Sequence, residues 1–299
     1  MLEEFKNAFQ RYNNAHVQLI IINVVIFMMM GVLYVLAKIA GTPQLFTLVY
    51  DQFTLPSVLS EFIREPWTLL TYSFAHYFSY EFGDIGIFHI LMNMLVFYWF
   101  GRLFVEYLGS DKLIALYVLG GLAGGLLYIG LYNTVPYFIA QPSSLVGASA
   151  AVYAVVVAVA TLLPNYTFFL LFLGPVRIKY IAAFYVVISF LSAVGSNAGG
   201  NIAHLGGALI GFVYMKQLQS GVNWGNWITV TIDWFKDLFK PRARVKVSYR
   251  KEGDAQQKSK GKPSVSQDEL DAILDKISAG GYESLTKEEK EKLFNASKK

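Results

Sequence analysis

Cysteine is absent from the 299 residues, and histidine occurs only four times. Without cysteine there is no disulfide, no thiolate nucleophile and no thiolate-ligated zinc or iron–sulfur centre, and four histidines leave little for a metal cage. The sequence also lacks H-E-x-x-H and G-x-x-x-x-G-K-[ST] motifs, which disfavours a zinc protease and nucleotide-driven transport. We therefore expect no cofactor and no metal, and a chemistry that relies on oxygen groups and imidazole.

Charge is scarce as well. Charged residues make up 15% of the chain, against 55% hydrophobic and 16% aromatic residues, and the mean hydropathy is +0.42. These values indicate a multi-spanning membrane protein. The net charge of +4 arises in the C-terminal part, because 17 of the 25 Lys and Arg residues lie from Lys216 onward. It therefore does not indicate a nucleic-acid-binding domain.

Six apolar segments are long enough to cross a bilayer as helices, which takes about 17 to 25 residues each. They cover residues 17–37, 85–104, 113–132, 145–163, 178–195 and 199–215. The predicted fold class is an all-α polytopic membrane protein, a bundle of six transmembrane helices. With the N-terminus in the cytoplasm, 23 of the 25 basic residues fall inside and only Lys38 and Arg64 outside. The positive-inside rule therefore predicts that both ends are cytoplasmic.

The connection over residues 41–84 is long for a compact bundle and rich in aromatic residues. Ordered loops of this length are usually functional, so we expect it to lie partly in the outer interface. The third and sixth spans carry small residues at four-residue spacing, which lets helix backbones approach closely. These residues are Gly120, Gly121, Gly124 and Gly125 in the third span, and Gly199, Ala203, Gly207 and Gly211 in the sixth.

Four polar side chains are predicted at membrane depth, where a polar or ionisable group is costly and needs a reason. They are His89 and Asn93 in the second span, Ser149 at the start of the fourth, and His204 in the sixth. His89 and Asn93 are four residues apart and share a helix face, as do Ser149 and Tyr153. All four lie near the outer ends of their helices in the predicted topology, so they can meet at one depth.

Each of these residues alone has an ordinary explanation. A serine in a membrane helix usually bonds its own backbone, and a histidine or asparagine there usually joins two helices. Together, a serine preceded by Gly147 at a helix N-terminus and an imidazole on another helix are the groups that nucleophilic acyl transfer needs. No Asp or Glu occurs between Asp111 and Asp233. Spans four to six therefore supply no triad carboxylate, and a catalytic Ser149 would act in a Ser–His dyad.

These motifs resemble those of the rhomboid family of intramembrane serine proteases over about half of the chain. They occur in the family's order: Trp67 with the run to His76; His89-x-x-x-Asn93; Glu106 followed by Gly109; Gly147-Ala-Ser149 with Tyr153; and Gly199-x-x-x-Ala203-His204-x-x-Gly207-x-x-x-Gly211. A G-x-S motif alone carries almost no information, but its combination with the sixth-span motif is specific. The chain resembles the bacterial type with six transmembrane helices, extended by a C-terminal cytoplasmic segment.

The resemblance implies roles for the matched residues. Ser149 would be the nucleophile and His204 the general base, with Tyr153 packed under the imidazole. His89 and Asn93, together with the backbone N–H of Ser149, would bind the oxyanion.

Outside the catalytic set, Glu106 resembles the family's structural carboxylate near the inner end of the second span, and Arg102, one turn earlier, could pair with it. The chain departs from the family at Thr68, where many relatives have arginine, and in its longer interval between His76 and His89. These departures affect what the resemblance implies for the loop and leave the catalytic set intact.

The implied reaction is hydrolysis of a peptide bond in or beside a transmembrane helix of another protein, through an acyl-enzyme. Two alternatives stay open: a rhomboid-like protein that binds membrane helices without cutting them, and a small transporter. Inactive family members usually lack the serine or the histidine, and both are present. No inverted repeat or midplane charge supports transport. We expect the bacterial cytoplasmic membrane as location, an active site near its outer face, and transmembrane substrates and lipids as partners, but no nucleic acid.

Five regions follow from these patterns: a cytoplasmic N-terminus (1–16), the membrane domain (17–217), an interfacial amphipathic and basic segment (218–251), a flexible linker (252–265) and a short helical hairpin (266–299). Tryptophans followed by Lys and Arg in the third region indicate contact with anionic lipid. Ser266 precedes Glu269 by three residues and Thr286 precedes Glu289 likewise, two capping boxes that predict two helices. With so few apolar residues, the hairpin is expected to bind a partner protein or a second copy.

Overall fold

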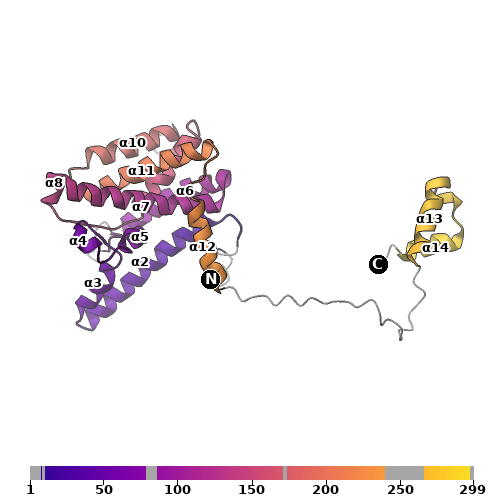
Figure 1. The fold of residues 1–299 in the computed structure, drawn as a ribbon, viewed down its shortest axis with the longest axis horizontal. Helices are drawn as coiled ribbons and strands as arrows, with labels where there is room; N and C mark the ends of the chain where they lie inside the picture. Colours follow the sequence, from indigo (N-terminus) through magenta and orange to yellow (C-terminus); the bar gives the residue numbers. More distant parts are fainter. Residues whose placement is uncertain (1–7, 9–10, 79–85, 171–173, 240–265, 297–299) are drawn as a thin grey trace. The chain divides into compact units, whose positions relative to one another are not determined.

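The computed structural model describes residues 8, 11–78, 86–170, 174–239 and 266–296. The chain divides into two compact units, Met1–Lys240 and Pro241–Lys299. Nearly all regular structure in the first unit is helical, and the second contains two further helices, α13 and α14 (Figure 1). The basic residues that follow position 239 and the predicted linker over 252–265 lie outside the described residues.

Six long helices in the described part of the first unit correspond to the six apolar segments. They are α2 (Ala15–Ile39), α6 (Gly86–Leu108), α7 (Ser110–Thr134), α9 (Ser149–Leu162), α10 (Ile178–Leu191) and α11 (Ala198–Gln219). Helices α2, α6 and α7 are long and apolar enough to cross a membrane, whereas α9 and α10 are apolar but have 14 residues each. The chain is a helical polytopic membrane protein, and the crossing of the bilayer by all six helices stays a prediction.

Helix α9 forms the centre of the bundle because its small residues let α11 and α7 approach its backbone. A Cβ added to Gly207 of α11 would overlap the carbonyl of Ala150, and one added to Gly211 would overlap the carbonyl of Ala154. On the other side, Gly120 of α7 lies so close that its Cβ would be 2.6 Å from that of Ala154. Ten of the 14 residues of α9 are buried, so this helix fixes the positions of its neighbours.

The connection between α2 and α6 contains short elements rather than an open loop. In the described residues these are α3 (Pro43–Asp51), β1 (Leu55–Pro56), α4 (Leu59–Phe62), α5 (Thr68–Thr71) and the 3-10 turn η1 (Tyr72–Phe74). Strand β1 pairs antiparallel with β2 (Ser144–Leu145), which lies just before α9. A further short helix, α8 (Pro136–Ile139), follows α7. The connection is therefore attached to the segment that leads into α9.

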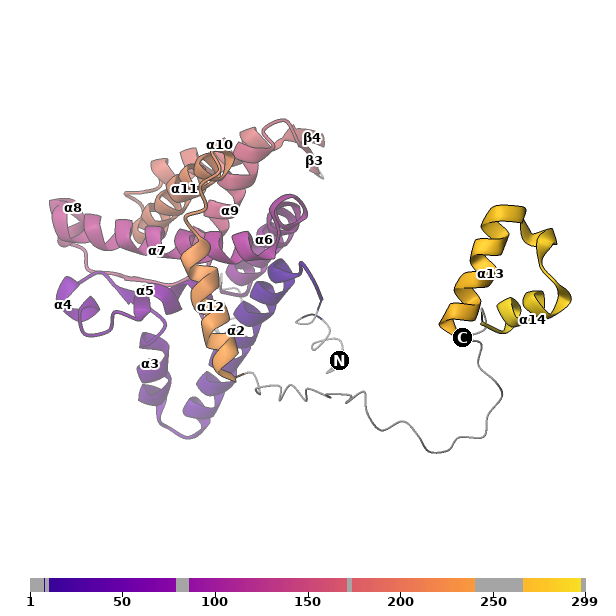
Figure 2. The same ribbon diagram turned by 45° about the vertical axis from the view of Figure 1, so that its right-hand side comes forward.

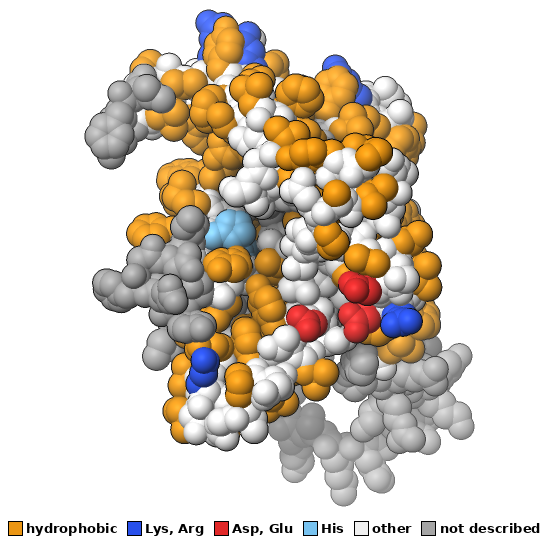
Figure 3. All heavy atoms as spheres, turned by 90° about the vertical axis from the view of Figure 1, so that its left-hand side faces the viewer, with side chains coloured by type: hydrophobic (Ala, Val, Ile, Leu, Met, Phe, Trp, Pro, Cys, Tyr) orange, Lys and Arg blue, Asp and Glu red, His pale blue; other side chains and the backbone are white. Residues whose placement is uncertain are grey.

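Seen from the side on which α8 lies, the surface is largely apolar, with acidic side chains and a histidine visible among the apolar ones (Figure 3). Asp51, Glu61 and Glu65 line a small polar hollow together with Arg64. Acidic and basic groups thus gather on the elements of the connection.

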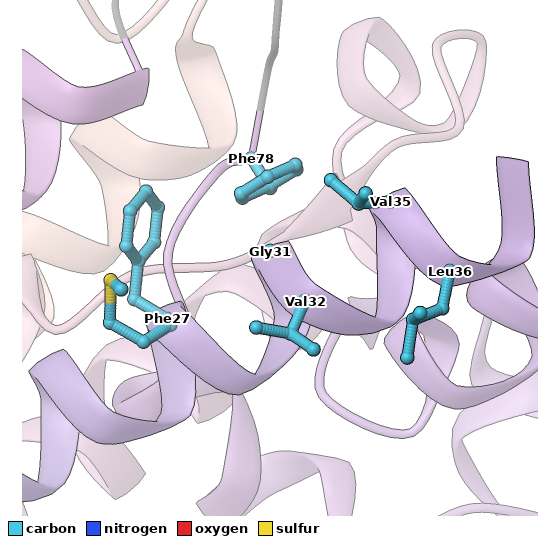
Figure 4. Close-up of a pocket in the computed structure, with 7 residues that line it drawn as sticks. Phe27, Gly31, Val32, Val35, Leu36 and Phe78 are labelled. Atoms are coloured by element: carbon cyan, nitrogen blue, oxygen red, sulfur yellow. The ribbon is translucent and has the colours of Figure 1, made fainter. Parts of the chain in front are cut away.

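Phe78 attaches the end of the described connection to α2. Its ring lies over Gly31, where an added Cβ would be 3.1 Å from it, and it contacts the rings of Phe27, Tyr34 and Phe46 at centroid distances of 5.4, 5.6 and 6.0 Å. An apolar pocket of about 380 Å³ lies beside this contact (Figure 4). The aromatic residues predicted to lie in the interface therefore pack partly against the first long helix.

Two elements lie at the opposite end of α7 from α8. The hairpin of β3 (Thr167–Leu170) and β4 (Gly174–Arg177) joins α9 to α10. Helix α12 (Asn226–Phe239) runs across the beginning of α7 (Figures 1 and 2), where Gly225 packs against Ala115. Tryptophans 227 and 234 and several further apolar side chains of α12 are exposed. An amphipathic helix with this orientation is suited to a membrane surface.

The second unit is a helical hairpin of α13 (Gln267–Gly280), the turn η2 (Tyr282–Ser284) and α14 (Lys287–Ala296). The Ser266 hydroxyl accepts a hydrogen bond from the Glu269 N–H, and Thr286 and Glu289 make the same arrangement for α14. Hydrogen bonds from the capping backbone N–H groups lower the pKa of both glutamates. Ile273 is the only α13 residue that is fully buried among the described ones, so the hairpin has little core of its own.

The close approach of α11 to α9 generates a first prediction. Gly207→Ala should lower the thermal stability of the protein in detergent, because the new methyl group overlaps a backbone carbonyl that cannot move alone; overpacking typically costs about 1–3 kcal/mol. Circular dichroism during heating measures the shift of Tm.

The matched control is Gly130→Ala on α7, where no atom lies within 4 Å of an added Cβ. Alanine favours a helix over glycine by about 1 kcal/mol, so this variant should melt at the same temperature or slightly higher. Equal behaviour of the two variants would contradict the packing described.

Candidate active site

The backbone around Gly147 presents Ser149 at the start of α9. Gly147 has a φ of +138°, a conformation that favours glycine, and its N–H donates to the carbonyl of Tyr72 at 3.0 Å. Ser149 is the first residue of the helix, and no side chain caps this terminus. The first N–H groups of a helix have no partner within it. Ser149 therefore combines a partly exposed hydroxyl with free backbone donors that favour negative charge.

His204 on α11 reaches the Ser149 hydroxyl. The Oγ of Ser149 lies 2.7 Å from Nε2 of His204, a hydrogen-bonding distance. The ring of Tyr153, one turn after Ser149 on α9, stacks on the imidazole with a centroid distance of 4.1 Å and an interplanar angle of 11°. Three residues predicted from the sequence to share one site are thus in direct contact.

Ser189 on α10 holds the other side of the imidazole, a contact that the sequence reasoning missed. Its Oγ lies 3.2 Å from Nδ1 of His204, and its hydroxyl donates to the hydroxyl of Tyr153 at 2.9 Å. The side chain is completely buried. A serine in the middle of an apolar span was the available signal, but serines there usually bond their own backbone, and spacing along one helix does not show what faces it.

These contacts define one consistent direction for the protons. If the Ser149 hydroxyl donates to Nε2 of His204, then the neutral imidazole carries its proton on Nδ1. Nδ1–H then donates to Ser189, and Ser189 donates to Tyr153. This series of hydrogen bonds sets the tautomer of His204 in which Nε2 carries no hydrogen and can accept a proton.

The imidazole of His89, on α6, lies beside Gly147. A Cβ added to Gly147 would be 3.2 Å from Cε1 of His89 and 3.7 Å from Oγ of Ser149, so the imidazole and the hydroxyl flank the same small volume. Asn93 lies one turn further along α6, and its Nδ2 donates to the carbonyl of His89 at 2.8 Å. Of the two predicted oxyanion side chains, the structure thus places His89 near Ser149 and bonds Asn93 to its own helix.

Asn23 is a second polar residue that the sequence did not indicate. It bonds His76, whose ring contacts the ring of His89. The rings of His76 and His89 are 5.6 Å apart, and Nε2 of His76 lies 3.1 Å from Oδ1 of Asn23 on α2. Asn23 also donates to the hydroxyl of Tyr117 at 3.0 Å, and Tyr117 donates to the carbonyl of Ser73 at 2.7 Å. His76 is buried, and this network connects α2, the long connection and α7.

The predicted ion pair between Arg102 and Glu106 is not formed. Both side chains are exposed on α6, and no ion pair or hydrogen bond joins them within the described part of the chain. The pairing was expected from their spacing of one turn. An exposed pair gains little and restricts two long side chains, so the spacing alone does not enforce it.

Two family models match parts of this chain. The family model described as the rhomboid domain matches residues 64–219, just over half of the chain and all of the site above except Asn23. A second model, described as a family of unknown function (DUF6576), matches residues 262–299.

Among curated proteins, RHOMBOID-like protein 12, mitochondrial, of Arabidopsis thaliana is 32% identical over 52% of this chain and 47% of its own length. The human presenilin-associated rhomboid-like protein, mitochondrial, is 31% identical over 45% and 35%, and RHOMBOID-like protein 1 of Arabidopsis thaliana is 30% identical over 53% and 37%. The chain thus spans less than half the length of these relatives. The family match over more than half of the chain shows that the protein belongs to the rhomboid family.

Proposed function

We propose that this protein is an intramembrane serine endopeptidase that hydrolyses peptide bonds in or beside transmembrane helices of other membrane proteins. The observation that carries the proposal is the 2.7 Å contact between Oγ of Ser149 and Nε2 of His204. Membership of the rhomboid family, which includes serine proteases and inactive relatives, supports it. The alternative, a protein that binds membrane helices without cutting them, is tested by the same experiments.

In the proposed reaction, Ser149 attacks the carbonyl carbon of the substrate while His204 accepts its proton at Nε2. The developing oxyanion is stabilised by the backbone N–H of Ser149 at the start of α9 and by His89 beside Gly147. Asn93 would assist through the second hydrogen of its amide, since the first bonds the carbonyl of His89. The amine leaves with the proton from His204, and a water molecule activated by the same imidazole hydrolyses the acyl-enzyme.

Ser189 and Tyr153 take the place of a carboxylate in this mechanism. When His204 accepts the proton, the imidazolium is stabilised by the hydrogen bond from Nδ1 to Ser189 and by the stacked ring of Tyr153. Both groups are neutral. A neutral partner orients the imidazole without adding a buried charge to a site at membrane depth.

The proposed arrangement in the membrane has six spans, both ends in the cytoplasm and the active site near the outer face. The charge distribution of the sequence supports this orientation. The bacterial cytoplasmic membrane stays a prediction, because the relatives named above come from a plant and a mammal. A helical substrate hides its carbonyls in hydrogen bonds, so it must unwind locally, and small or helix-breaking residues near the cut are expected.

The dyad generates the second prediction. Ser149→Ala and His204→Ala should each abolish cleavage of a transmembrane reporter in proteoliposomes, because nucleophile and base act as one unit. Electrophoresis of the reporter measures the product. Ser144→Ala, at an exposed serine of β2, is the matched control and should cleave like the wild type. Near wild-type cleavage by either dyad variant would refute the mechanism, provided that all variants insert equally.

The position of Ser189 generates the third prediction. Ser189→Ala should lower kcat by about tenfold and change KM little, because the hydrogen bond between Nδ1 of His204 and Ser189 strengthens when the imidazole becomes charged, from about 0.5–1.5 kcal/mol for a neutral pair to about 1.5–3 kcal/mol. Ser189→Thr, which keeps the hydroxyl, should restore most of the activity. Ser192→Ala, at the end of α10, serves as control.

A merely structural role for Ser189 has a different signature. In that case Ser189→Ala would lower Tm with an unchanged kcat per folded molecule, and threonine would give no kinetic rescue. Either result would remove Ser189 from the mechanism and leave the dyad prediction in place.

A further inference from the structure

A large groove lies between α6, α10 and the hairpin β3–β4. Its volume is about 1080 Å³, slightly above the range of roughly 300–1,000 Å³ for small-molecule sites. The rings of Phe100 and Phe168 meet at 5.2 Å where the hairpin reaches α6. Aromatic side chains make up much of the wall: Trp99, Phe100, Tyr166, Phe168, Phe169, Tyr180, Phe184 and Tyr185.

Two opposite charges lie at one end of this groove. Arg102 and Glu106 both line it, both are exposed, and no ion pair or hydrogen bond joins them or satisfies either within the described residues. They stand one turn apart, about 6 Å along the helix axis, and Glu106 is nearer to the end of α6 at Leu108.

In the proposed six-span arrangement, this end of the groove lies at a membrane surface. Glu106 is two residues from the end of a helix long enough to span the membrane. Arg177 ends the neighbouring strand β4, and the ammonium of Lys179 lies over the ring of Tyr180 at 5.3 Å. Tyrosine and basic residues gather at the boundary between hydrocarbon and water. The order from the hydrocarbon outward is therefore an aromatic wall, then a guanidinium, then a carboxylate.

We propose that the groove binds a phospholipid whose headgroup carries a phosphate followed by a primary ammonium, as in phosphatidylethanolamine. Along such a lipid the order from the hydrocarbon outward is acyl chain, phosphate, ammonium, which complements the order of the groups in the groove. Arg102 binds the phosphate, for which a guanidinium is well suited. Glu106 binds the ammonium, which also lies at the negative end of the α6 dipole.

Other occupants match this order less well. An anionic lipid without an amine has no ammonium to pair with the carboxylate of Glu106, which would then lie near the negatively charged phosphate. A choline headgroup has the positive charge but no N–H to donate to the carboxylate. A transmembrane helix of another protein does not carry a fixed negative group followed by a positive group that would match Arg102 and Glu106. The proposal does not depend on the proposed protease activity.

The test uses the full-length Ser149→Ala protein in detergent and native mass spectrometry with lipids that share their acyl chains. The series is phosphatidylethanolamine, its N-methyl and N,N-dimethyl derivatives, phosphatidylcholine and phosphatidylglycerol. Affinity should fall along the methylation series by about tenfold in total, because hydrogen bonds to the carboxylate are lost, and phosphatidylglycerol should bind more weakly than phosphatidylethanolamine.

Two variants test which side chain binds the phosphate and which binds the ammonium. Glu106→Gln should bind phosphatidylethanolamine and phosphatidylcholine equally, whereas Arg102→Gln should weaken both by a similar factor because both carry the phosphate. Asp111→Asn and Lys112→Gln, at the start of the next helix and outside the groove lining, are the matched controls and should keep the wild-type series.

Three results would overturn the proposal. An equal affinity for all headgroups would show non-selective lipid contact only. A preference for phosphatidylglycerol would show a simple basic site. Displacement of all lipids by a transmembrane peptide, with no headgroup preference, would show a groove for helices. If Glu106→Gln does not fold, the methylation series on the unchanged groove and Arg102→Gln still decide.

Discussion

Glycine at positions 207 and 211 allows α11 to lie against the backbone carbonyls of α9, and the geometry of the site depends on that approach. In lipid no hydrophobic force drives one helix against another, so association relies on close packing and on hydrogen bonds. His204 stands three residues before Gly207 on α11, and Ser149 directly precedes Ala150, whose carbonyl Gly207 faces. The separation of the two helices therefore sets the 2.7 Å between Nε2 and Oγ.

A second constraint is that each polar group inside the bundle needs a partner, because the membrane core offers no water. Two networks in the described residues provide many of these partners, whereas Nδ1 of His16, Nδ1 of His76 and the hydroxyl of Tyr128 are buried without one. One runs from Ser149 through His204 and Ser189 to Tyr153, and the other joins Asn23, His76 and Tyr117. The first orients the imidazole without a carboxylate. The second connects α2 to the long connection and lies behind His89. The hydrogen bonds that position the imidazole of His204 thus also give partners to buried polar groups.

The sequence predicted the helices well, because each is a long apolar segment between breaks in the pattern. It also indicated which residues share a face of one helix, such as Ser149 with Tyr153. It did not indicate Ser189 or Asn23, because spacing within a helix does not show which residues of another helix face them. The expected pair of Arg102 and Glu106 failed for a related reason, since a spacing of one turn permits a contact without enforcing it.

Reaction with a fluorophosphonate tests the central claim, that Ser149 is an activated nucleophile, without knowledge of any substrate. The reagent is added to membranes that contain the wild type or Ser149→Ala, and the modified residue is located by peptide mass spectrometry. The account predicts one labelled site, Ser149, in the wild type and none in the variant. Labelling that is equal in both proteins, or absent from a folded wild type to which the reagent has access, would contradict it.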